Sequence, residues 1–104
     1  MNHPYSPKDP EEEVIRSWNF GPRLAEGETL DTAVVTIERQ DGATEDTSAM
    51  LNGEADLSQK PTVRQAIKGG TDGVTYILRF KATTSRPQVL VETPTQLVER
   101  GGKA

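Results

Sequence analysis

The chain has 104 residues, of which 33% are hydrophobic, and 16 acidic against 12 basic residues give it a formal net charge of −4. This length predicts one domain with a single thin core, and the charge has the wrong sign for a nucleic-acid partner, which attracts clustered Lys and Arg. The absence of cysteine from the sequence excludes disulfides, thiolate metal sites and cysteine nucleophiles.

The sequence is not expected to carry a signal peptide or a membrane-spanning segment. The chain begins M-N-H-P-Y-S-P-K-D-P, without the apolar stretch of a signal peptide. No apolar run approaches the ~20 residues that a helix needs to span a bilayer. We therefore expect a protein without a membrane partner, in the cytoplasm where it is made.

Residues 1–12 are predicted to form a flexible arm. Pro4, Pro7 and Pro10 exclude a helix and interrupt strand pairing. Two interpretations remain open, a terminus without a role and an arm that becomes ordered on a neighbouring subunit. Residues 13–99 would then form the single folded domain, and residues 100–104, R-G-G-K-A, a flexible tail.

Alternation of apolar and polar residues predicts the strands in chain order. Residues 13–20 place Val14, Trp18 and Phe20 on one face, together with Arg16, whose stem can lie along an apolar surface. Residues 30–38 alternate in the same way and are rich in β-branched side chains, which favour strands.

Residues 43–61 are open to two interpretations. The first is a short strand over residues 47–51, followed by a tight turn at Asn52-Gly53 and a returning strand through Ala55 and Leu57. The second is a single helical turn over residues 48–51. We favour the strand.

The strongest strand signal follows a turn cluster at residues 69–73. Residues 62–67 form one strand, with Val63 and Ile67 directed inward. Residues 74–84 form the next, with Tyr76, Leu78 and Phe80 among the side chains of one face.

Residues 88–98 form the last predicted strand. It places Val89, Val91, Thr93, Thr95 and Leu97 on one face. Pro94 lies inside it and has no N–H to donate, so this strand is expected at a sheet edge or with a bulge.

About six or seven short strands with regular turns and no sustained helical period predict an all-β fold, an antiparallel two-sheet sandwich. The expected core comprises Trp18, Phe20, Val35, Ile37, Ile67, Tyr76, Leu78 and Phe80.

No stretch shows the constellation of an active site. The single histidine, His3, lies in the proline-rich arm, and Asp41, Glu45 and Asp46 lack the spacing of a Ca²⁺ loop. Residues 68–71, K-G-G-T, have the wrong order for a phosphate loop. We therefore predict no catalytic residue, no cofactor, no metal site and no enzymatic activity.

Three basic residues on predicted strands have two interpretations. Arg16, Arg79 and Lys81 would form a small basic stripe if their strands were neighbours. They would otherwise be solvated charges that protect sheet edges, which is the interpretation we favour.

The approach to the strand at residues 74–84 resembles the E–F corner of immunoglobulin-like and fibronectin type III domains. In those domains a tyrosine near the start of strand F hydrogen-bonds to backbone upstream. Tyr76 matches that residue, and Leu78 and Phe80 follow it on the same face. The resemblance implies an immunoglobulin-like sandwich in which Tyr76 has a structural role, and is silent on function.

Residues 8–98 as a whole resemble small virion proteins of tailed bacteriophages, of the neck, head–tail or fibre–tail adaptor type. The resemblance rests on four motifs that occur in order: K-D-P-E-E-E-V (8–14), A-E-G-E-T-L (25–30), G-G-T-D-G-V-T-Y (69–76) and A-T-T-S (82–85). The chain departs from the pattern at Arg16 and Trp18, where a tyrosine and an aliphatic residue are expected.

The resemblance implies a structural assembly protein of a phage or prophage virion, made in the bacterial cytoplasm and bound to other virion proteins. The alternative is a fibronectin-like binding or spacer module of a bacterial surface or carbohydrate-active protein. In either case we expect function at the surface, because so thin a core leaves no room for a ligand cavity of about 300 Å³. The expected partner sites are the termini and two unguarded strand edges, residues 88–91 and the first strand, on a protein that is a monomer or weak oligomer when isolated.

Overall fold

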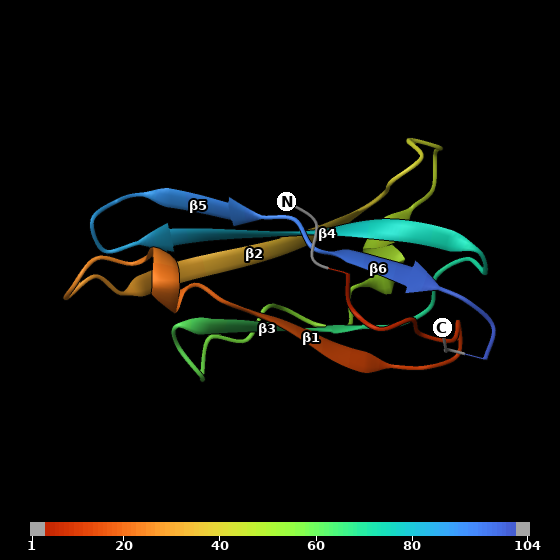
Figure 1. The fold of residues 1–104 in the computed structure, drawn as a ribbon, viewed down its shortest axis with the longest axis horizontal. Helices are drawn as coiled ribbons and strands as arrows, with labels where there is room; N and C mark the ends of the chain where they lie inside the picture. Colours follow the sequence, from red (N-terminus) through yellow and green to blue (C-terminus); the bar gives the residue numbers. More distant parts are fainter. Residues whose placement is uncertain (1–3, 102–104) are drawn as a thin grey trace.

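Two antiparallel sheets face each other in the computed structural model, which describes residues 4–101 (Figure 1). The smaller sheet pairs β1 (Val14–Asn19) with β3 (Thr62–Ile67). In the larger, β4 (Val74–Thr84) pairs with β2 (Leu30–Arg39) on one side and with β5 (Val89–Glu92) and β6 (Thr95–Val98) on the other. The predicted all-β antiparallel sandwich is confirmed; its immunoglobulin-like character stays a prediction.

The faces that line the core follow the alternation in the sequence. Along β4, every second side chain from Tyr76 to Thr84 is buried, and β2 contributes Val35 and Ile37 opposite. The buried apolar residues of the core are Phe20, Leu30, Val35, Ile37, Met50, Val63, Ile67, Tyr76, Leu78, Phe80, Ala82, Leu90 and Val98. Trp18 is half-buried and packs against this core from its margin.

The last predicted strand is two strands, β5 and β6, interrupted at Thr93-Pro94. Both halves keep the same register against β4, and Leu78 N–H donates to the Pro94 carbonyl at 2.8 Å. Pro94 has no N–H to donate to the Leu78 carbonyl, so one hydrogen bond of the ladder is missing. The pairing register with β4 is the same on both sides of this position. Leu90 points into the core, so its neighbours Val89 and Val91 lie on the outer face of the sheet. The shared face predicted for these two valines is therefore the outer one.

The strand that we favoured over residues 47–51 is wrong, and the helical turn is correct. The structure forms a 3-10 helix, η2 (Thr47–Met50), in which the Ser48 N–H donates to the Asp46 side chain at 3.2 Å. Met50 then enters the core. A short polar–apolar alternation cannot distinguish the two conformations, and here the cap at Asp46 stabilises the helical one.

The hairpin turn predicted at Asn52-Gly53 is also wrong. The segment does not fold back on itself but runs along the outer edge of β3. Asn52 N–H donates to the Ala66 carbonyl at 3.0 Å, and Asp56 and Arg64 exchange two backbone hydrogen bonds of 2.7 and 3.1 Å. Residues 52–56 therefore close the β3 edge.

Residues 4–8 run beside β6 and lie between it and β1 (Figure 1). Tyr5 N–H donates to the Thr95 carbonyl at 2.9 Å, and the Tyr5 hydroxyl donates to the Ser17 carbonyl of β1 at 2.6 Å. These contacts place residues 4–8 against both sheets of the sandwich. Residues 1–3, including His3, and 102–104 lie outside the described residues, so flexibility of the whole arm and tail stays a prediction.

Lys8 fixes the end of this segment. Its N–H donates to the Leu97 carbonyl at 3.0 Å, and its side chain is fully buried. The ammonium donates to the Gly69 carbonyl at 2.6 Å and to the Asp9 carbonyl at 3.0 Å, and burial lowers the pKa of the Lys8 ammonium. The arm is thereby joined to the turn that precedes β4.

Candidate interaction surfaces

The residues singled out from the sequence as structural lie inside the sandwich. Phe20, Tyr76, Leu78 and Phe80 are each 0% exposed, and Trp18 is at the margin. The structure thus places Phe20, Tyr76, Leu78 and Phe80 beyond the reach of a partner and leaves Trp18 partly exposed, so contacts with a partner are expected on the surface of the sandwich.

The Tyr76 hydroxyl reaches the turn before β4. It accepts from Thr71 N–H at 2.8 Å and donates to the Glu45 carboxylate, whose oxygens lie 2.9 and 3.0 Å away. Backbone contact at this turn was expected. The carboxylate partner was not, because neither interpretation of residues 43–61 placed Glu45 beside Tyr76. That the contact is an immunoglobulin-type corner stays a prediction.

The acidic residues considered for a Ca²⁺ loop have protein partners. Arg39 binds Glu45 at 3.0 Å and Asp41 at 2.8 Å, and its guanidinium lowers the pKa of the Asp41 carboxyl to about 2. Asp46 accepts from Ser48. Within residues 4–101 no group of three or more His, Cys, Asp or Glu could hold a metal ion.

The hypothetical basic stripe is wrong because its members belong to different sheets. Arg16, on β1, donates to Gln96 Oε1 at 2.6 Å and to the Ser6 carbonyl at 3.0 Å. Arg79 and Lys81 are exposed on the outer face of β4. Since β4 has strands on both sides, these two residues do not guard an edge.

Strands β5 and β6 form one edge of the larger sheet. The arm pairs with this edge along β6, and among the described residues no strand pairs with it along β5. Thr84 N–H donates to the Gln88 carbonyl at 2.9 Å, so the even-numbered residues bond to β4 and the odd-numbered ones direct their backbone groups outward. The arm occupies the β6 end. At the β5 end Val89 is exposed and Val91 is partly buried. Among residues 4–101 their outward backbone groups have one hydrogen-bond partner, Arg23 Nη1, which donates to the Val91 carbonyl at 3.3 Å.

The first strand is less open than expected. Phe20 N–H donates to the Pro61 carbonyl at 3.1 Å, so Ser17 directs its backbone groups away from β3. The Tyr5 hydroxyl already occupies the Ser17 carbonyl. The arm therefore guards part of the β1 edge.

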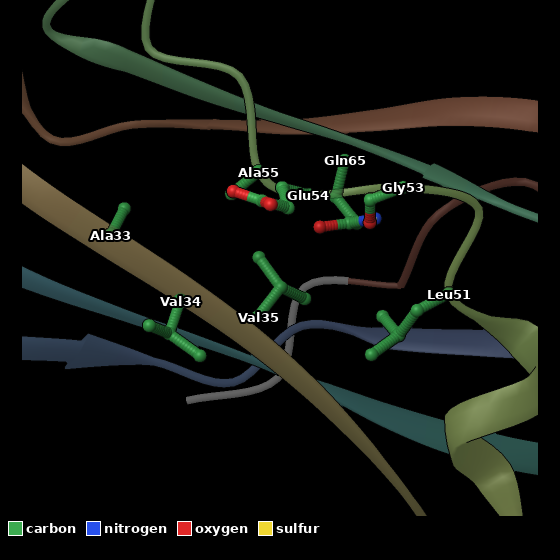
Figure 2. A pocket seen from close by; sticks show the side chains of 8 residues that line it. All are labelled: Ala33, Val34, Val35, Leu51, Gly53, Glu54, Ala55 and Gln65. Atoms are coloured by element: carbon green, nitrogen blue, oxygen red, sulfur yellow. The ribbon is translucent and has the colours of Figure 1, made fainter.

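A third edge, that of β2, was missed by the sequence reasoning. β2 pairs with β4 alone, and a hollow of about 340 Å³ separates its free edge from residues 51–55 of the facing layer (Figure 2). The thin core was expected to leave no room for a ligand cavity of about 300 Å³, and this space is an open hollow at the margin of the sandwich, not a cavity in the core. Its lining residues are Ala33, Val34, Val35, Leu51, Gly53, Glu54, Ala55 and Gln65.

Comparison with known proteins gives one family. The family model of the podophage GP4 fiber-tail adaptor protein gp77 matches residues 8–95. No curated protein matches the chain. Among residues 4–101 no helix has the length and apolar character that a membrane crossing requires.

The matched residues extend from the arm at Lys8 to the start of β6 and thus include both sheets. The match favours a virion protein over the bacterial surface module that we kept as the alternative. The chain belongs to the family of the podophage GP4 fiber-tail adaptor protein gp77 and is a structural adaptor protein of a phage virion.

Proposed function

We propose that the protein is a non-enzymatic connector between fibre and tail that docks through the open edge of β5. It assembles into the particle from the bacterial cytoplasm and is a monomer or weak oligomer when isolated. The proposal rests on one observation. The outward backbone groups of Val89 and Val91 pair with no strand among residues 4–101, where the Val91 carbonyl has a side-chain partner, Arg23 Nη1, and the others have none.

An edge of this kind recognises protein. An extended segment that adds to a sheet gains main-chain hydrogen bonds whatever its sequence, and side chains at alternate positions supply specificity. Val89, which is 57% exposed, offers an apolar contact beside those backbone groups. One short edge binds weakly, and repetition of the contact at a symmetric junction of tail and fibres would raise the overall affinity.

The first and last described segments lie side by side at the end of the sandwich away from β5 (Figure 1). Asp9 accepts from Gly101 N–H at 2.8 Å, which joins the first and last described segments. A partner seated at this end would therefore meet both segments at once, as an adaptor with docking termini requires.

Val91→Pro is expected to reduce incorporation of the protein into phage particles about tenfold, as the loss of about 1.4 kcal/mol of binding would give. Proline removes the outward N–H and obstructs an approaching strand, yet leaves the even-numbered residues that bond to β4. The measurement is the amount of this protein in particles purified from a phage that depends on the supplied variant.

The matched control is Val91→Thr, which keeps the β-branched shape and the N–H. It is expected to be incorporated like the parent. Melting temperatures of the purified variants show whether each is folded. Normal incorporation of a folded Val91→Pro would contradict docking at β5.

A further inference from the structure

The free edge of β2 has a regular set of unpaired backbone groups. Gln40 N–H donates to the Thr75 carbonyl at 2.9 Å, so the even-numbered residues of β2 bond to β4. Ala33, Val35 and Ile37 consequently direct their N–H and C=O groups to the open side. Thr47 Oγ1 occupies the Ile37 carbonyl, which leaves the groups of Ala33 and Val35 without a partner among residues 4–101.

A buried side chain presents an acceptor to the same space. Gln65 is 2% exposed, and its amide nitrogen donates to the Gly53 carbonyl at 3.0 Å and to the Ala66 carbonyl at 2.8 Å. No donor among the described residues reaches its Oε1, which points into the hollow toward Val35 (Figure 2). Among the described residues no buried side-chain nitrogen or oxygen lacks a partner, so this oxygen is open to the hollow, where the N–H of an occupant would donate to it.

The remaining lining determines the chemistry of the occupant. The apolar part of the lining consists of Val35, Leu51 and Ala55. A small aliphatic side chain that entered the hollow would pack against them. Glu54 stands at the exposed rim and forms no ion pair or hydrogen bond in the described part of the chain. Its charge complements a Lys or Arg placed next to that aliphatic residue.

We propose that β2 accepts an extended segment of a second virion protein as an added strand. The strand pairs with Ala33 and Val35, places a small aliphatic side chain in the hollow, donates to Gln65 Oε1 and presents a Lys or Arg to Glu54. This inference rests on the proposed connector function and extends it. Because β2 and β5 lie on opposite sides of β4, the two edges hold two partners on opposite sides of one sheet.

Photo-cross-linking in the particle tests the assignment. The chain contains no cysteine, so Val34→Cys and Val89→Cys each provide a single site for a thiol-linked photo-reactive group. Val34 and Val89 are matched in exposure, at 58% and 57%, and stand beside the β2 and β5 edges respectively. Each labelled protein is bound to particles that lack this component and irradiated, and the linked peptides are identified by mass spectrometry.

The expected result is that Val34→Cys links to an aliphatic, Lys- or Arg-containing segment of a different virion protein, and Val89→Cys to another segment. Two results would overturn the β2 assignment and leave the β5 assignment standing. In the first, Val34→Cys links to a second copy of this chain. In the second, Val34→Cys gives no link while Val89→Cys links normally. If neither site links in particles that contain the protein, both assignments fail.

A blocking variant supplies a second readout. Ala55→Leu narrows the hollow and is expected to lower the Val34→Cys linkage about tenfold, equivalent to about 1.4 kcal/mol of lost binding. It should leave the Val89→Cys linkage and the melting temperature of the free protein unchanged. Undiminished linkage from Val34→Cys in the Ala55→Leu background would show that the hollow is not the site.

Discussion

Gly70→Ala is expected to lower the free energy of unfolding by about 2–5 kcal/mol, through backbone strain of about 1–2 and overpacking of about 1–3. Gly70 has φ +101, a conformation that side chains with a Cβ disfavour. A Cβ there would also lie 2.7 Å from Val98 Cγ2 and 3.2 Å from Met50 Cε. Both contacts are inside the core, where neighbours have little space to move.

Gly73→Ala separates the two effects. Gly73 lies in the same turn with φ +85, but an added Cβ would meet no atom within 4 Å. Its loss is expected to be about 1–2 kcal/mol, from backbone strain alone. Urea denaturation of both variants provides the comparison, and equal losses would contradict the close packing of Val98 and Met50 beneath Gly70.

Tyr76→Ala is expected to cost about 3–5 kcal/mol, as for other buried aromatic side chains. The ring is 0% exposed, and its hydroxyl connects three segments: the turn at Thr71, the acidic loop at Glu45 and β4 itself. The variant therefore loses both packing and the connection between two loops. Chemical denaturation followed by Trp18 fluorescence measures the change.

Tyr76→Phe isolates the hydroxyl. It leaves the ring in place but deprives Thr71 N–H of its acceptor and Glu45 of a donor, so that a loss of about 1–3 kcal/mol is expected. Glu45→Gln is the matched control, since it keeps an acceptor for the hydroxyl while removing the charge that pairs with Arg39. A Tyr76→Phe variant as stable as the parent would reject a structural role for the hydroxyl.

The sequence was sufficient to predict those strands whose inner face is apolar and whose outer face is polar. Tyr76, Leu78 and Phe80 alternate with Arg79 and Lys81, and burial of such a strand is possible in one orientation only. Pro94 likewise identified the place where the last strand is interrupted, because a missing N–H is a local property.

The edges depended on interactions between distant segments, which local patterns do not contain. Residues 52–56 cover β3 instead of forming a hairpin, and the arm covers β6, so β2 and β5 are left open. Lys8 illustrates the difficulty. A lysine after two prolines predicts an exposed charge, yet its stem is buried and its ammonium binds the Gly69 carbonyl 61 positions away.

A cryo-electron microscopy map of the phage tail with its fibres attached tests the connector account most directly. The account predicts this sandwich between the two components, with a strand of one neighbour continuing the sheet beyond β5 and a segment of another beside β2. A particle in which both edges face solvent, with the neighbours held by other surfaces, would contradict it.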